Sequence, residues 1–254
     1  MNLSFLKILC GLLVLGISAT PVCAEKPASF DQANRLFQSG DFEAAASAYQ
    51  NAIHADGPSA ALLYNLGNSY YRVGQYGPAI LAYERAKLLT PRDPDLMANL
   101  NLARKAATVF DKGNFDPRLE AVLTWLSRNE WSWLVAGSAL WIGVISVVGG
   151  ALRTLRPGPR RVMIGSTVLA GLMVAAGSTA LFLRRDEDTR GIVLSKDAAV
   201  HLSPFEKAET IGTPGAGRVV RMGEKNGGYY YINIPGTELH GWMGEKDVEM
   251  IVKK

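Results

Sequence analysis

The chain has 254 residues, of which 48% are hydrophobic and 20% are charged, a composition typical of folded protein and not of a disordered tail. Its formal net charge of +4 is small and no run of five Lys or Arg residues occurs, so the composition gives no support for nucleic-acid binding. The apolar residues concentrate near 5–19, 131–152 and 162–183, which predicts several separate parts and not one core.

Residues 1–24 are predicted to be a secretory signal peptide. Lys7 supplies a positive charge, a short apolar segment follows it, and Val22-Cys23-Ala24 is typical of a cleavage site. Both cysteines of the chain, Cys10 and Cys23, lie in this segment. We therefore expect a mature chain without disulfides, cysteine nucleophiles or cysteine ligands for zinc.

Residues 26–110 contain an internal repeat. Five positions recur 34 residues later (74 − 40): Gly40, Phe42, Ala45, Tyr49 and Ala52 correspond to Gly74, Tyr76, Ala79, Tyr83 and Ala86. A period of this length is typical of stacked helix pairs. We expect the two glycines to end the first helix of each pair in a left-handed conformation, and a third helix at about 94–110 to cap the stack.

Together with the stretch Leu63 to Tyr71, these positions resemble the tetratricopeptide repeat. The resemblance implies a concave groove lined by residues of the first helices. The candidates for a peptide-binding groove are Asn34, Asn65, Asn68, Arg72 and Asn99. Asparagine amides both donate and accept, so a row of them suits the backbone of an extended peptide, and arginine suits a carboxylate. The alternative is that the asparagines are solvated or bond to neighbouring helix ends.

A linker is expected at 111–130, followed by a transmembrane hairpin. The stretches 131–152 and 162–183 each hold 22 residues without a charge, enough for a helix to cross a hydrocarbon core of roughly 30 Å. The turn at 153–161 contains four arginines, which favours the cytoplasmic side for it and the extracytoplasmic side for both soluble parts. Arg184 and Arg185 oppose this orientation, but the signal peptide supports it independently.

Residues 190–254 change to period-two alternation with Gly and Pro at the turns. The pattern predicts strands at 191–194, 198–202, 218–222, 229–234 and 248–251, and therefore a small all-β barrel. The landmarks from Ala199–Pro204 to Gly241–Met243 resemble the bacterial SH3 family. Tyr229, Tyr231 and Trp242 are candidates for an aromatic groove that binds an extended peptide or the cell wall. The alternative is that they are ordinary surface aromatics of a barrel.

Catalysis is not expected. The three histidines, His54, His201 and His240, lie in different predicted elements, and none has a close carboxylate pair in sequence. No nucleophile motif occurs. We therefore predict no catalytic residue, no metal site, no cofactor and no enzymatic activity.

The predicted fold class is multi-domain: an α-helical tetratricopeptide repeat solenoid, a transmembrane helical hairpin and an all-β SH3-like barrel. This order, with the segment Trp125 to Trp133 before the first span, resembles the BatE proteins of the aerotolerance operon family. That resemblance implies envelope partners, namely membrane proteins with von Willebrand factor A domains and a MoxR-type ATPase.

Two hypotheses about function follow. The first is an adaptor in the bacterial inner membrane, held in the lipid bilayer, whose soluble parts bind envelope proteins. The second is recognition of peptidoglycan through the SH3-type module.

Overall fold

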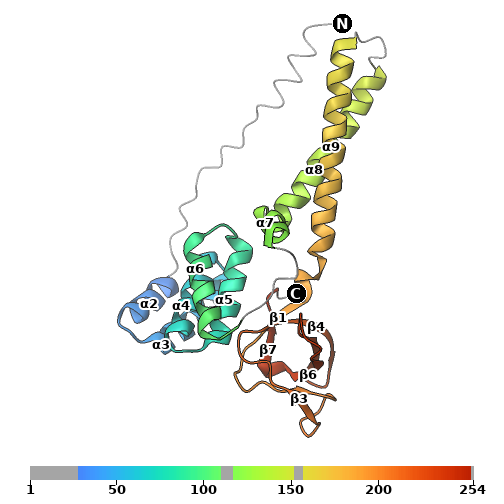
Figure 1. Ribbon diagram of the computed structural model, residues 1–254. Helices are drawn as coiled ribbons and strands as arrows, with labels where there is room; N and C mark the ends of the chain where they lie inside the picture. The colour runs from blue at the N-terminus through green and yellow to red at the C-terminus, as the bar shows by residue number, and fades with distance from the viewer. Residues whose placement is uncertain (1–27, 110–116, 152–156, 253–254) are drawn as a thin grey trace.

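The computed structural model describes residues 28–109, 117–151 and 157–252. The predicted signal peptide lies outside the described residues, and so do residues 153–156 of the predicted turn at 153–161, whereas 157–161 already belong to the helix that follows. Within the described ranges the chain forms a group of short helices, a long helical hairpin and an antiparallel sheet (Figure 1).

Five antiparallel helices make up the first part. They are α2 (Ala28–Gln38), α3 (Phe42–Asp56), α4 (Ala60–Arg72), α5 (Tyr76–Leu89) and α6 (Pro94–Ala106). Gly40 and Gly74 have φ values of +85° and +77°, so the predicted left-handed ends after α2 and α4 are confirmed. Small residues line the contacts between helices, and the repeated Tyr49 and Tyr83 are both 1% exposed in the cores. These helices form the repeat-like architecture that the 34-residue period predicts.

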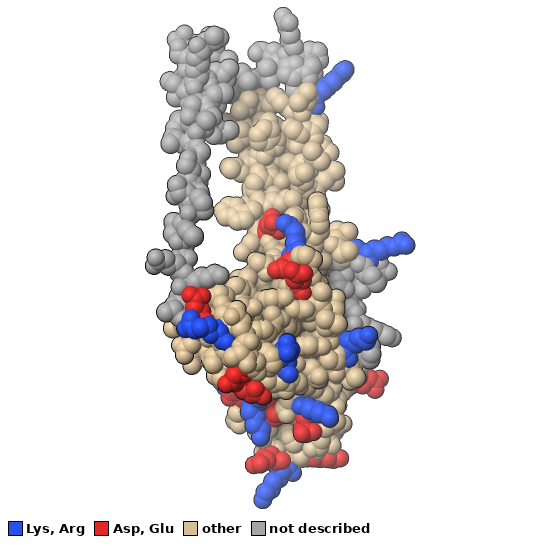
Figure 2. Space-filling view, turned by 90° about the vertical axis from the view of Figure 1, so that its left-hand side faces the viewer, with Lys and Arg blue, Asp and Glu red and all other residues tan. Residues whose placement is uncertain are grey.

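A short helix and a hairpin follow. Helix α7 (Pro117–Trp125) lies inside the segment expected as a linker, and α8 (Arg128–Ala151) and α9 (Pro157–Leu183) pack side by side along their length (Figure 1). The stretches Arg128–Gly149 and Arg160–Thr189 are long and apolar enough to cross a membrane. The charged side chains on the face in Figure 2 gather over the helical repeats and the sheet, while the column of α8 and α9 is uncharged over most of its length.

After a 3-10 turn, η1 (Arg185–Thr189), the chain forms seven strands. They are β1 (Arg190–Val193), β2 (Val200–His201), β3 (Thr210–Gly212), β4 (Val219–Asn226), β5 (Tyr229–Asn233), β6 (His240–Gly244) and β7 (Val248–Met250), with the turn η2 (Glu245–Asp247) before the last strand. The strand order is β3-β2-β6-β5-β4-β1-β7, all antiparallel.

This order leaves β3 and β7 as the two edges, so the sheet is not closed into the barrel that the sequence predicted. Closure would need hydrogen bonds between the two edge strands. β3 is a three-residue strand that pairs only with the two-residue β2, and β7 pairs only with β1. The coarser prediction of a small all-β module is confirmed, and the structure shows that its strands are antiparallel.

The repeats and the sheet share a buried core. Ile80 of α5 belongs to the same apolar cluster as Ile192, Val219 and Ile251 of the β module. Gly77 lies so close to the backbone carbonyls of Val193 and Leu194 that a Cβ at this position would overlap with them. The sheet is therefore packed on the face of α5, and the repeats and the β module lie at the same end of the hairpin (Figure 1).

Polar contacts reinforce this packing. Arg85 of α5 donates to the side chain of Glu249 at 2.8 Å and to the carbonyls of Met250 at 2.6 Å and Ile251 at 3.1 Å. An arginine holds several acceptors at once because its donors are fixed in one plane. Helix α5 is thus joined to the last strand by both apolar and ionic contacts.

Candidate functional site

A network of asparagine and tyrosine side chains connects the first helices of the repeats. We call this the asparagine network; it comprises Asn34, Tyr49, Tyr64, Asn65, Asn68, Tyr83 and Asn99. All four asparagines are partly exposed. The network contains four of the five groove residues that the sequence singled out.

The same two hydrogen bonds occur in each repeat. The Tyr49 hydroxyl donates to Asn34 Oδ1 at 2.6 Å, and the Tyr83 hydroxyl donates to Asn68 Oδ1 at 2.7 Å. The neighbouring amide then donates to the same oxygen, at 3.4 Å from Asn65 to Asn34 and at 3.0 Å from Asn99 to Asn68.

Tyr49 and Tyr83 act as donors in this network, whereas the Tyr64 hydroxyl accepts from Asn99 at 2.8 Å. Burial raises the pKa of Tyr49 and Tyr83 above the ordinary tyrosine value, so both hydroxyls stay protonated. Each of these buried hydroxyls donates to an asparagine oxygen, so the two tyrosines fix the amide orientations of Asn34 and Asn68.

The fixed orientation decides what a ligand would meet. Both lone pairs of Oδ1 in Asn34 and Asn68 are used inside the network, so these two residues can offer only N–H donors to a ligand. Asn65 and Asn99 donate into the network and can offer their Oδ1 acceptors. Donors and acceptors therefore recur in pairs along the helices, which suits the alternating N–H and C=O groups of a peptide backbone.

A cavity of about 210 Å³ lies over one end of this network. Its lining residues are Phe37, Asn68, Tyr71, Arg72, Tyr83, Asn99 and Leu102. Arg72 is exposed, with its guanidinium carbon 4.2 Å from the centre of the Phe42 ring. Stacking on the ring leaves the N–H edge of the guanidinium for a carboxylate. The structure thus brings Asn68, Arg72 and Asn99 together at the cavity, with Asn34 and Asn65 one repeat along.

Four lining residues were not among the predicted groove residues: Tyr83, which the sequence indicated only as a repeat position, and Phe37, Tyr71 and Leu102. The 34-residue period contains the information that could have identified Phe37, Tyr71 and Leu102. Phe37 and Tyr71 are equivalent positions (71 − 37), and Leu102 is equivalent to Asn68 (102 − 68). Extending the period to all first-helix positions would have found an apolar wall beside the polar network.

The comparisons with known proteins support the repeats. Residues 30–95 match the family model of the tetratricopeptide repeat. The tetratricopeptide prediction is therefore confirmed for that part of the chain, which includes Asn34, Asn65, Asn68 and Arg72. This repeat is a non-catalytic protein-interaction module. The sequence has no match among the curated proteins.

The three aromatic residues predicted for the β module lie on neighbouring strands. Tyr231 of β5 is directly opposite Trp242 of β6, with ring centres 5.4 Å apart and an angle of 75° between the rings. Tyr229 makes an edge contact with His201 of β2 at 6.2 Å. We call Tyr229, Tyr231 and Trp242 the aromatic face; all three side chains are partly exposed. Ile232, which period-two alternation puts on the opposite face from Tyr229 and Tyr231, is fully buried.

The histidines beside this face have structural contacts. His201 Nδ1 lies 3.2 Å from the carbonyl of Ala208, and His240 Nδ1 lies 2.8 Å from the carbonyl of Glu238. Each of these nitrogens therefore donates to the backbone of its own loop. Among residues 28–109, 117–151 and 157–252, no three His, Cys, Asp or Glu side chains gather in a way that would hold a metal ion.

Proposed function

We propose that this protein is a membrane-anchored adaptor of the bacterial cell envelope that binds an extended segment of a partner protein in the groove of its repeats. The observation that carries the proposal is the asparagine network, since it fixes side-chain amide donors and acceptors for a peptide backbone beside an apolar wall. Asn34, Asn65, Asn68 and Asn99 bind the peptide backbone, and Arg72 binds an acidic side chain or a terminal carboxylate.

The anchor in this proposal is the hairpin of α8 and α9. Two features support it: each helix is long and apolar enough to span, and both soluble parts lie at the same end of the pair (Figure 1). The four arginines at 153–161 favour a cytoplasmic turn. In this proposal the repeats and the β module therefore lie on the extracytoplasmic side of the inner membrane. The finer identity that we propose is a BatE-type component of a stress-tolerance complex with von Willebrand A-domain proteins and a MoxR-type ATPase.

The proposed anchor is tested by determining on which side of the membrane each part of the chain lies. Single cysteines at Ser47→Cys, Thr154→Cys and Ser203→Cys would be introduced into a chain carrying Cys10→Ser and Cys23→Ser. Spheroplasts would then be treated with a membrane-impermeant maleimide. We expect labelling at positions 47 and 203 and none at 154 until the membrane is opened. Labelling at 154 alone would reverse the topology and contradict the proposal.

A second candidate function is recognition of peptidoglycan through an SH3-type β module. The aromatic face favours it, because half-exposed tyrosine and tryptophan rings on adjacent strands can stack on a sugar or hold a stem peptide. The test uses the full chain, because the β module shares a core with α5 and would expose Ile192, Val219 and Ile251 if isolated.

For that test, solubilised protein would be sedimented with purified sacculi, with and without soluble muropeptides. If the module recognises peptidoglycan, we expect the protein to bind sacculi and soluble muropeptides to compete with this binding. The Trp242→Ala variant should bind less. Binding that is absent, or that Trp242→Ala leaves unchanged, would remove this candidate and leave the adaptor function alone.

A further inference from the structure

Helix α7 carries an exposed apolar stripe. Leu119, Val122 and Trp125 are 41%, 57% and 71% exposed, and their spacing of three residues places them along one side of the helix. We call these three residues the apolar face of α7. On an adjoining side of the helix, Leu123 is 5% exposed and packs with Trp131 of α8 and Ala180 of α9. The helix is thus anchored through one side and presents a second apolar side outward.

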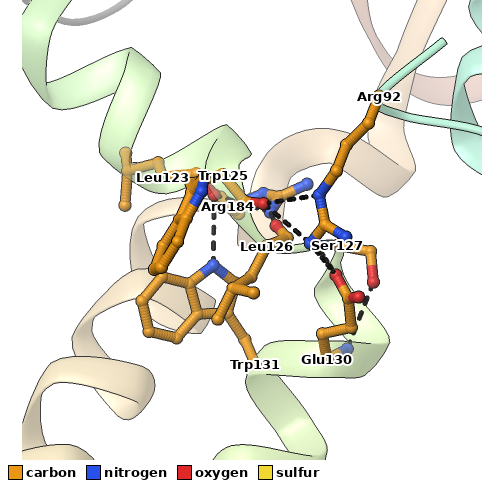
Figure 3. Close-up of polar contacts among 8 residues, drawn as sticks. All are labelled: Arg92, Leu123, Trp125, Leu126, Ser127, Glu130, Trp131 and Arg184. Atoms are coloured by element: carbon orange, nitrogen blue, oxygen red, sulfur yellow. Dashed lines mark hydrogen bonds and ion pairs between the residues drawn. The ribbon is translucent and has the colours of Figure 1, made fainter.

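The end of α7 is held by donors from three different parts of the chain (Figure 3). Trp131 Nε1 and Arg184 Nη1 donate to the Leu123 carbonyl at 3.1 Å and 2.9 Å, and Arg184 also donates to the Leu126 carbonyl at 2.8 Å. Terminal helix carbonyls lack partners within the helix, so cationic and indole donors satisfy them. Helix α7 is therefore fixed against the bases of both α8 and α9.

The third donor comes from the repeats. Arg92, between α5 and α6, donates to the Trp125 carbonyl at 2.9 Å and 3.1 Å and to the Glu130 carboxylate at 2.8 Å. Glu130 in turn accepts from the backbone N–H of Ser127 at 2.8 Å. Figure 3 shows Arg92 reaching this turn from the opposite side to Trp131. One short helix thus connects the repeats to the hairpin.

We propose that the apolar face of α7 lies in the lipid–water interface of the membrane and that α7, through Arg92, sets the height of the repeats above the bilayer. This inference rests on the proposed membrane hairpin. The occupant of the face is the lipid surface, because α7 ends directly before the first candidate span begins at Arg128. Trp125 and Trp133, which are 71% and 77% exposed, flank that boundary, where tryptophan is enriched in membrane proteins.

Accessibility of a spin label tests the proposal. Nitroxide labels would be attached at Val122→Cys, at Thr124→Cys on another side of α7, and at Leu140→Cys on the exposed surface of α8, which is the control for the hairpin. The full chain, with Cys10→Ser and Cys23→Ser, would be reconstituted in vesicles of phosphatidylethanolamine and phosphatidylglycerol. Collisions with oxygen, which partitions into lipid, would be compared with collisions with a water-soluble nickel complex.

We expect the label at 122 to lose nickel collisions and gain oxygen collisions, as at 140, while the label at 124 keeps its nickel collisions. Nickel access at both 122 and 124 with a lipid-exposed 140 would overturn the proposal and leave the hairpin intact. Shielding of 122 from both reagents would mean that protein covers the face, which also overturns it. Nickel access at 140 would remove the hairpin itself, and with it this inference.

Discussion

The two candidate binding surfaces of this protein are built in different ways. In the repeats, polar side chains are partnered by buried tyrosines, and the same hydrogen bonds recur after 34 residues. On the β module, Tyr231 and Trp242 lie opposite each other on paired strands and contact through ring edges that remain partly exposed. The comparison teaches that the groove depends on buried polar pairs and the aromatic face does not, so the groove should be the more sensitive to substitution.

The largest effect is expected from a buried ion pair between α5 and α6. Glu84 of α5 is 5% exposed and is paired with Arg104 of α6. Arg104→Ala leaves a buried carboxylate without its partner, which costs about 3–5 kcal/mol. Hydrogen exchange of the solubilised full chain would show this as lost protection in α5 and α6. Protection equal to that of the unsubstituted chain would contradict the role of the pair, and Arg35→Ala on the exposed side of α2 is the matched control.

A smaller effect is expected from overpacking the buried contact between Gly67 and Tyr83. A Cβ on Gly67 would lie 2.5 Å from the buried ring of Tyr83, so Gly67→Ala must displace the tyrosine that orients Asn68. Overpacking of this kind costs about 2 kcal/mol. The first repeat supplies the control, because Ala33 already occupies the equivalent position (67 − 33). Ala33→Gly should cost only about 1 kcal/mol, measured by the same exchange experiment; equal effects of the two changes would disprove this account.

Acid should weaken the repeats before the sheet. Burial alone would raise the pKa of Glu84, but the nearby charges of Arg104, Lys87 and Arg190 outweigh it and hold the pKa below the ordinary value of 4.5. A depressed folded-state pKa gives stability that is complete above the unfolded value and is lost as the pH falls through the folded one. We expect exchange protection in α5 to fall below pH 4.5 while β5 and β6 change less. The opposite order would contradict the assignment.

The smallest effect is expected on the aromatic face. Trp242→Leu keeps apolar bulk and removes the edge contact with Tyr231, which is worth about 1 kcal/mol. Local exchange in β5 and β6 should rise slightly, with no change in α4 to α6. A loss as large as that of Arg104→Ala would show that the aromatic face is part of the core and not a surface.

The same comparison explains what the sequence could predict. The repeats could be predicted because Asn34 and Asn68, like Tyr49 and Tyr83, are 34 residues apart. Each copy of the repeat therefore predicts the structure of the other. The alternation of Tyr231 and Ile232 likewise predicted which side of β5 is buried. Local patterns of this kind predict the secondary-structure elements and which face of each element is buried.

Contacts between segments that are distant in the sequence could not be predicted from it. Arg85 bonds to the carbonyl of Ile251, 166 positions away, and Gly77 packs on Leu194, and no local pattern encodes either contact. The prediction of a closed barrel was wrong for the same reason, because closure depends on whether the two edge strands pair with each other. Helix α7 was missed because its nine residues are too few for a clear period.

The most direct test of the groove as the binding site is site-specific photo-crosslinking in membranes. A benzoylphenylalanine would replace Leu102, which lines the cavity, or Ser47, which lies on the exposed side of α3 as the control. We predict a discrete adduct with an envelope protein from position 102 alone, and its loss when Asn68→Leu removes the amide beside the cavity. Adducts of equal yield from both positions, or an adduct from 102 that Asn68→Leu leaves unchanged, would contradict the claim that the partner binds through the asparagine network.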